Sequence, residues 1–265
     1  MLTRENAKIA FIGFGNMASA MADGLIRSGK VRPEQLGASA LHADALREKT
    51  KARGMKALTS NQEAATWGDV VVIAVKPNLV QSVVEPIKEV LSHKIVLSVA
   101  VNLLFESYEK LLTPGTEHLS LLPNTPVLVG EGVLLCEARH SLKTESYALV
   151  SDLLSLLGLV LTTPTEKMKA AGVISGCGPA YVAMFIEALA DGAVLHGVPR
   201  DMALKLAAQT LAGTAALHLA TGTHPGAMKD AVCSPGGTTI VGVAALEKTG
   251  FRGSVIDAVD AVMKK

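Results

Sequence analysis

The chain has 265 residues, of which 49% are hydrophobic and 3% aromatic, and its formal net charge is +1. So apolar a chain can bury a sizeable aliphatic core in one large domain or two smaller ones, which excludes a disordered protein. No block of lysine and arginine stands out, so we expect no nucleic-acid partner held by charge.

The cysteines and histidines give no sign of a metal site. Cys136, Cys177 and Cys233 form no CxxC pair, and the histidines lack metal-ligand spacing. We therefore expect no bound metal and a reduced, cytoplasmic enzyme. The first residues lead almost at once into a strand-like segment, without the regions of a signal peptide. No apolar run approaches the roughly 18 to 20 residues that span a bilayer, so no membrane partner is expected.

The first 163 residues alternate short β-rich runs with helical patterns. Helices are expected at 16–29, 43–54, from Ser60 onward, and at 86–92 and 141–158. Strands are expected at 9–15, 35–41, 55–58, 69–77, 94–101, 117–123, 132–137 and 159–164. This βαβ rhythm predicts a doubly wound parallel sheet of the Rossmann type.

From residue 164 onward the strand signal vanishes. Long helices are expected at 178–197, 199–221, 236–250 and 251–265, with few polar positions on any face. Such helices must be buried on several sides, and a subunit interface is the simplest way to do so. The sequence thus predicts an α/β protein with a Rossmann-type domain at 1–163 and an all-helical domain at 164–265 that forms a homodimer.

A glycine-rich loop, "GFGNMA", follows the first predicted strand and opens the first helix. This is the context required for a dinucleotide fingerprint: Gly13 permits the tight turn, Gly15 the approach of a pyrophosphate, and Ala18 close helix packing. The alternative is a glycine-rich turn that holds no ligand. The expected cofactor-binding residues of the loop are Ile12, Gly13, Phe14, Gly15, Asn16 and Met17.

The end of the second strand bears on which dinucleotide binds. It reads Ser39, Ala40, Leu41, His42, without the acidic residue that holds the ribose hydroxyl of NAD. We therefore expect NADP(H) to be preferred, with NAD(H) possible.

The fourth strand closes with "AVKP", at the edge where ligands bind in this architecture. Cofactor contacts are expected there, although an ordinary strand end with a surface lysine has the same sequence. The residues concerned are Ala74, Val75, Lys76 and Pro77.

Several motifs together resemble the pyrroline-5-carboxylate reductase family. They are "GFGNMA", "AVKP", "LPNTP" at 122–126, "SGCGPAY" at 175–181, "EALADGAV" at 187–194 and "HPGAMKDAVCSPGGTTIVGVAALE" at 224–247. The resemblance implies a Rossmann domain, a helical dimerisation domain and a ring of dimers. It also implies reduction of the cyclic imine L-1-pyrroline-5-carboxylate by NAD(P)H to L-proline, the last step of proline biosynthesis.

The resemblance also implies where the small-molecule substrate binds. The turn "SPGGTT" precedes a helix and offers amides from Gly237, Thr238 and Thr239 to a carboxylate. Thr239 matches the family threonine that contacts the imine nitrogen, and it is the catalytic candidate. The alternative is that Thr238 or Thr239 only caps the helix. The further expected contacts are Ser175 and Ser234 for the substrate, and Ser39 and Asn61 for the cofactor.

"SGCGPAY" is expected to separate two helices, because Gly176 and Gly178 break the first and Pro179 begins the second. The chain departs from the family pattern at four positions near the expected site: Lys169, Gly172, Cys177 and Ala231. These departures leave open a related imine substrate or a non-catalytic dinucleotide-binding paralogue. A β-hydroxyacid dehydrogenase, a further alternative, needs a lysine on the helix after the interdomain loop, and residues 178–191 contain none.

Overall fold

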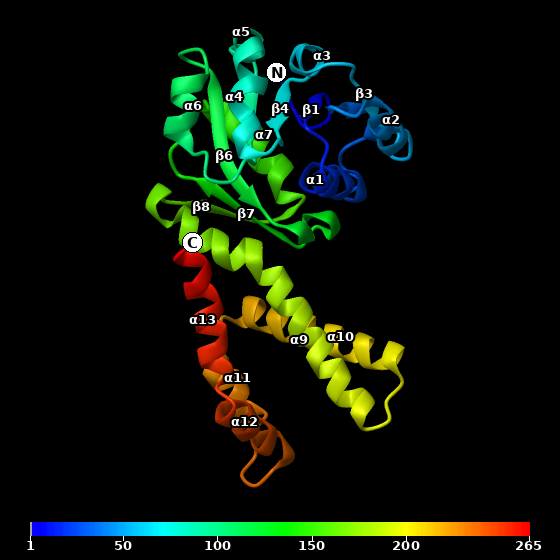
Figure 1. Cartoon of the computed structure of the whole chain (residues 1–265), viewed down its shortest axis with the longest axis vertical. Helices are drawn as coiled ribbons and strands as arrows, with labels where there is room; N and C mark the ends of the chain where they lie inside the picture. The colour runs from blue at the N-terminus through cyan, green and yellow to red at the C-terminus, as the bar shows by residue number, and fades with distance from the viewer. Residues whose placement is uncertain (1) are drawn as a thin grey trace. The chain divides into compact units, whose positions relative to one another are not determined.

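The computed structural model describes residues 2–265 and divides them into two compact units, one ending at Gly176 and one running from Cys177 to Lys265 (Figure 1). This division comes later than the boundary expected between residues 163 and 164. The segment between the two positions includes helix α8 (Met168–Gly172), which packs against strand β7 (Gly132–Glu137). Met168 is buried there, which explains why the segment belongs with the first unit.

The first unit is built on one sheet with the strand order β3-β2-β1-β4-β5-β6-β7-β8 (Figure 1). The other strands are β1 (Ile9–Ile12), β2 (Leu36–Ser39), β3 (Lys56–Ala57), β4 (Val70–Ile73), β5 (Ile95–Ser98), β6 (Glu117–Pro123) and β8 (Gly158–Thr163). All pairs from β3 to β6 are parallel, which confirms the predicted doubly wound sheet.

The strand pair at the far edge runs the other way, because β7 pairs antiparallel with β6 and β8 pairs parallel with β7. The reason lies in the connection between β6 and β7, residues 124–131. A parallel pair needs a crossover of about a dozen residues or more, and this connection is too short.

Helices cover both faces of the sheet. Along β1 the side chains alternate, so Ile9 and Phe11 pack with α1 (Asn16–Arg27), α2 (Ala43–Lys51) and α7 (Thr144–Ser155). Ala10 and Ile12 pack on the other face with α3 (Asn61–Trp67), α4 (Val80–Val84), α5 (Lys88–Leu91) and α6 (Phe105–Leu111). The sequence did not predict α6, whose seven residues are too few to show a helical period.

Helix α1 touches the chain backbone directly at Gly24. A Cβ placed there would overlap the carbonyl oxygen of Val127, in the 3₁₀ turn Thr125–Val129, and would come within 2.7 Å of Leu157. Only a glycine permits this approach, so the position of α1 is set by a contact without side chains.

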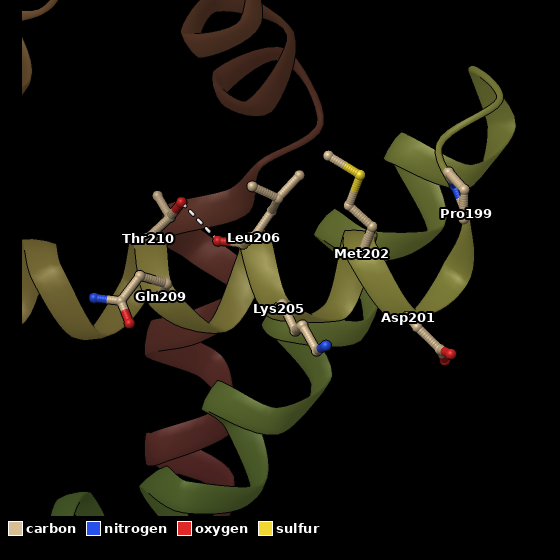
Figure 2. A pocket seen from close by; sticks show the side chains of 7 residues that line it. All are labelled: Pro199, Asp201, Met202, Lys205, Leu206, Gln209 and Thr210. Carbon is tan, nitrogen blue, oxygen red and sulfur yellow. Dashed lines mark hydrogen bonds between the residues drawn. The ribbon is translucent and has the colours of Figure 1, made fainter.

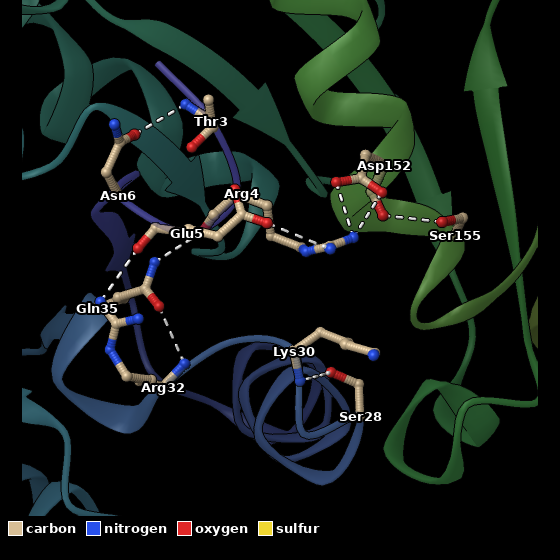
Figure 3. A network of polar contacts seen from close by, with 10 residues as sticks. All are labelled: Thr3, Arg4, Glu5, Asn6, Ser28, Lys30, Arg32, Gln35, Asp152 and Ser155. Carbon is tan, nitrogen blue, oxygen red and sulfur yellow. Dashed lines mark hydrogen bonds and ion pairs between the residues drawn. The ribbon is translucent and has the colours of Figure 1, made fainter. Parts of the chain in front are cut away.

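The N-terminal residues are held by a polar network (Figure 3). The Gln35 amide donates to the carbonyl oxygens of Arg4 at 2.7 Å and Ala7 at 3.0 Å. The Arg4 guanidinium in turn donates to both carboxylate oxygens of Asp152 in α7, at 2.7 and 2.9 Å. These bonds fasten the segment before β1 to the start of β2 and to α7.

The second unit consists of helices α9 (Gly178–Leu195), α10 (Arg200–Thr221), α11 (Pro225–Ala231), α12 (Thr238–Lys248) and α13 (Phe251–Met263). Helix α9 packs on α10, and α12 on α13. Within residues 177–265 the buried apolar side chains are Ala190, Ala203 and Ala207. Large side chains stay exposed, among them Leu195 at 81% and Leu219 at 77%, so one chain alone leaves these apolar helices uncovered.

The glycines of "SGCGPAY" do not separate two helices, and that expectation was wrong. Helix α8 continues through a single π turn, Val173–Cys177, into α9. A π turn inserts an extra residue without ending the helix. The expectation that no apolar run approaches the length that spans a bilayer was also wrong. Thr165–Leu195, 31 residues, is the one stretch within 2–265 that is long and apolar enough by length and composition.

The contact at Gly24 gives a prediction about stability. Gly24→Ala should lower the free energy of unfolding by about 3 kcal/mol, because the new methyl group meets backbone that cannot retreat. Urea unfolding at fixed protein concentration, followed by the fluorescence of the single tryptophan, Trp67, measures it. Ser19→Ala in the same helix is the control and should change stability by less than about 0.5 kcal/mol. Equal stability of the two variants would show that the contact at Gly24 is not restrictive.

Candidate active site

The ends of β1, β2 and β4 meet at the glycine-rich loop. The Gly13 amide donates to the Ser39 carbonyl oxygen at 2.9 Å, and the Ala74 amide donates to Ile12 at 2.8 Å. Gly13 has φ +89°, and a Cβ there would lie 2.7 Å from the Ala74 carbonyl oxygen and 2.8 Å from Cγ1 of Val75. The structure therefore brings five of the predicted cofactor-binding residues together, and its own packing requires glycine at position 13.

Gly15 differs from Gly13 because the protein itself does not need a glycine there. A Cβ at Gly15 would have no heavy atom within 4 Å. Gly15 is the N-cap of α1 and makes no side-chain cap, and the first turn of the helix holds no acidic residue. Gly15 and Asn16 are both exposed. The open space thus lies at a positive helix end, as a phosphate group requires.

Phe14 is buried, although the next residue, Gly15, is exposed. Its ring is 5% exposed and meets Phe11 edge-on, and the Arg53 guanidinium lies 5.7 Å from the ring centroid. Asp23 of α1 holds Arg53 through two hydrogen bonds of 2.6 and 2.8 Å. The side chain of Phe14 therefore anchors the loop, and Phe14 can contact a cofactor only through its backbone. Met17 is partly buried against the same core.

At the end of β2 a neutral pair takes the place of a carboxylate. The buried Ser39 hydroxyl donates to Oδ1 of Asn61, the first residue of α3, at 2.9 Å. Asp44 and Arg47 form an exposed ion pair of 3.3 Å on α2. Nothing negative at Ser39 opposes a ribose 2′-phosphate. Beyond β4, Lys76 and Pro77 are exposed at the start of the 3₁₀ turn Pro77–Leu79.

Asn124 is a residue that the sequence analysis did not single out. Its amide nitrogen donates to the Ser175 carbonyl oxygen at 2.9 Å, and its oxygen accepts from the Val133 amide at 2.8 Å. The motif "LPNTP" contains it and was the available signal. Asn102, after β5, is the one non-glycine among residues 2–265 with positive φ, at +65°.

In the second unit, "SPGGTT" forms a tight turn. The Gly237 amide donates to the Ser234 carbonyl oxygen at 3.0 Å, and Gly236 has φ +69°. Proline followed by glycine with positive φ is the type II pattern. A Cβ at Gly237 would overlap the Ser234 hydroxyl, which would have to turn away to make room for it.

The turn leads directly into α12, whose N-cap is Gly237 and makes no side-chain cap. Thr238 and Thr239 are the first residues of the helix, so the alternative that one of them caps it was wrong. Both threonines and Ser234 are exposed, and the first turn holds no acidic residue. The expectation that the Gly237 amide is free was wrong, because it donates to the Ser234 carbonyl oxygen. The Thr238 and Thr239 amides lie at the N-terminus of the helix and can donate to an anion, with hydroxyl groups beside them.

One hollow of the second unit lies away from the predicted site residues. A hollow of about 530 Å³ lies along one face of α10, lined by Pro199, Asp201, Met202, Lys205, Leu206, Gln209 and Thr210 (Figure 2). It contains none of the predicted site residues and is formed by one helix with its preceding loop. Across residues 2–265 no group of three or more His, Cys, Asp or Glu side chains could hold a metal ion.

Comparisons with known proteins decide the family. Residues 165–265 match the family described as "Pyrroline-5-carboxylate reductase dimerisation", and residues 8–102 match "NADP oxidoreductase coenzyme F420-dependent". The pyrroline-5-carboxylate reductase of Treponema pallidum is 41% identical over 96% of this chain and 98% of its own. This chain belongs to the pyrroline-5-carboxylate reductase family. The pyrroline-5-carboxylate reductase of Escherichia coli is 39% identical over 97% of this chain and 96% of its own.

A solved relative agrees in three dimensions. The Plasmodium falciparum pyrroline carboxylate reductase with NADP bound has a TM-score of 0.87 at 33% identity, covering 98% of this chain and 97% of that one. The helical region is thus a dimerisation domain of this family, which accounts for its exposed apolar side chains and for the apolar stretch Thr165–Leu195.

One departure from the family pattern has a structural reason. A Cβ at Gly172 would lie 3.1 Å from Cδ1 of Leu122, at the end of β6. Glycine therefore lets α8 approach the "LPNTP" segment closely, and a larger residue would push the leucine aside by a few tenths of an ångström.

The two loop glycines give a matched pair of predictions. Gly15→Ala should leave the free energy of unfolding within about 1 kcal/mol of wild type, because the methyl group meets nothing. It should weaken NADPH binding at least about tenfold, because that methyl fills the space of the pyrophosphate. Gly13→Ala should instead destabilise the protein itself. Fluorescence titration with NADPH and thermal unfolding measure both, and undiminished binding by Gly15→Ala would contradict the assignment of this loop.

The three cysteines should differ in reactivity. Burial raises the pKa of the Cys136 thiol on β7 to about 12, whereas Cys177 and Cys233 are partly exposed. At pH 8 Cys136 is then almost wholly protonated and shielded, so a thiol reagent should label it only in denaturant. Mass spectrometry of labelled peptides measures this. Cys136→Ser is the control, because it removes the cysteine that should be labelled only in denaturant. Labelling of Cys136 in the folded protein would contradict the burial.

Proposed function

We propose that this chain is a pyrroline-5-carboxylate reductase, which reduces L-1-pyrroline-5-carboxylate to L-proline with NADPH in the last step of proline biosynthesis. The observation that carries the proposal is the "SPGGTT" turn, where a positive helix end and exposed hydroxyls are set for a small carboxylate. Near-complete matches to reductases of this name support it.

The residues of the first unit fit a dinucleotide. The open space at Gly15 would take the pyrophosphate, and the Ser39–Asn61 pair would lie at the ribose. NADP(H) is preferred in this proposal, because no carboxylate at the end of β2 opposes a 2′-phosphate; NAD(H) is a second possible donor. When bound, the cofactor supplies the hydride.

The substrate-binding groups in this proposal are Ser175, Ser234, Gly237, Thr238 and Thr239. The amides of Thr238 and Thr239 bind the substrate carboxylate, Gly237 lets the ligand approach the turn, and the Thr239 hydroxyl forms a hydrogen bond to the imine nitrogen. Fixing the ring in this way makes the transfer effectively unimolecular. No strongly acidic or basic side chain is required, which agrees with a turn made of Ser, Pro, Gly and Thr.

We further propose that the protein is cytoplasmic and assembles as a ring of dimers through the helical domain. The exposed apolar side chains of α9, α10 and α13 support association, and so does the family name of this region.

The function is tested by oxidation of NADPH and of NADH, with and without L-pyrroline-5-carboxylate. We expect substrate-dependent oxidation by wild type, a higher kcat/KM with NADPH, and a loss of about a hundredfold in kcat for Thr239→Ala. Thr239→Ser keeps the hydroxyl and is the matched control, expected to retain most activity. A protein that binds NADPH but never oxidises it with this substrate would overturn the proposal in favour of a shifted substrate or a non-catalytic paralogue.

A further inference from the structure

We infer that Asn124 is a positioning residue for substrate binding: its side-chain amide holds the Ser175 carbonyl and so fixes the π turn that carries the Ser175 hydroxyl. The inference rests on the proposed function, because it concerns the binding of that substrate. It assigns a role to the "LPNTP" segment, which contributes none of the proposed cofactor or substrate contacts.

Both halves of the Asn124 carboxamide are committed. The side chain is 7% exposed, its oxygen accepts from the Val133 amide, and its nitrogen donates to the Ser175 carbonyl oxygen at 2.9 Å. A backbone amide can only donate and a carbonyl can only accept, so these partners fix which way the carboxamide faces. Aspartate keeps the size and the acceptor but presents an oxygen to Ser175.

The Ser175 carbonyl accepts a hydrogen bond from outside its own helix. In a regular helix the carbonyl of residue 175 would accept from the amide of residue 179, and proline has no N–H. The chain forms the π turn Val173–Cys177 at this place. Asn124, 51 residues away in sequence, supplies a donor to the carbonyl that the proline leaves without its usual partner.

A second contact beside Asn124 holds the same segment. Leu122 lies two residues before Asn124. Its Cδ1 is so near Gly172 that a Cβ added to the glycine would lie only 3.1 Å from it. The end of β6 thus touches the helical segment at Gly172 and binds it at Ser175. The 3₁₀ turn that follows Asn124 packs through Val127 against Gly24 of α1. These contacts therefore connect the π turn, through residues 122–127, to helix α1, which begins at the glycine-rich loop.

The consequence is a defined direction for the Ser175 hydroxyl. The hydrogen bond to the carbonyl fixes the peptide plane after Ser175, and with it the backbone that carries the side chain. Without the donor, the turn loses this tie and the hydroxyl is no longer held in one place. Binding of the substrate should weaken, whereas the space at Gly15 is untouched.

The test compares Asn124→Ala and Asn124→Asp with wild type in the NADPH assay. We expect the KM for L-pyrroline-5-carboxylate to rise about five- to tenfold in both, because each variant loses the hydrogen bond to the Ser175 carbonyl. Asn124→Ala also loses the bond from the Val133 amide, which Asn124→Asp can keep. The values of kcat and of the KM for NADPH should stay within about twofold. Asn124→Asp keeps the size of the side chain, so it serves where the alanine variant folds poorly.

Two further variants separate positioning from stability. Gln35→Leu removes another buried carboxamide that donates to backbone carbonyls (Figure 3), and it should lower Tm without changing the KM for the substrate. Ser175→Ala should raise that KM by itself, and adding Asn124→Ala to it should raise KM little further, because the two residues act as a unit.

The outcomes distinguish the two proposals. Wild type without turnover on this substrate overturns the proposed function, and this inference with it. An active wild type whose Asn124 variants lose Tm but keep KM, whose variants all fail to fold, or whose effects add to those of Ser175→Ala would overturn the positioning role alone.

Discussion

Helix α1 can lie where it does because backbone meets backbone at two glycines. At Gly13 the loop passes within van der Waals contact of the Ala74 carbonyl, and at Gly24 the helix rests on the carbonyl of Val127. Neither approach tolerates a Cβ. Everything proposed for the cofactor depends on this placement, because it sets the N-terminus of α1 at the ends of β1, β2 and β4. Gly15 lies between the two glycines, and a Cβ there would meet no heavy atom within 4 Å, so packing within this chain does not explain a glycine at that position.

The contact that supports α1 is also connected to Ser175, one of the proposed substrate-binding residues. The 3₁₀ turn that supports α1 begins right after Asn124, and Asn124 binds the Ser175 carbonyl. The π turn lies just before Pro179, whose missing N–H removes one α-helical hydrogen bond at this point. Asn124 thus supplies a hydrogen bond near Pro179, and Gly24 leaves room for the turn that follows Asn124.

Local sequence patterns were enough to predict the strands and the glycine-rich loop. Each of the eight strands is present, because buried parallel strands read as continuous apolar runs and glycines mark their ends. The fingerprint loop was recognised for the same reason. Local sequence patterns could not predict which distant segments come together. The reversed direction of β7 and β8 follows from a short connection, and the hydrogen bond of Asn124 to Ser175 joins residues 51 positions apart. The continuous helix through Gly176 and Gly178 was missed because propensity treats glycine as a helix breaker, whereas packing and the π turn decide here.

The two units differ in how they obtain hydrophobic stabilisation. The first buries two aliphatic layers on its sheet, with side chains such as Phe11, Ile73 and Leu134 fully covered. Within residues 177–265 the buried apolar side chains are all alanines, while Met184, Leu195 and Leu219 remain exposed. Burying a leucine or methionine side chain is worth about 1.5–3 kcal/mol, and one copy of these helices gains little of it. The stability of the helical domain is therefore tied to association, and a family region named for dimerisation is where such a dependence belongs.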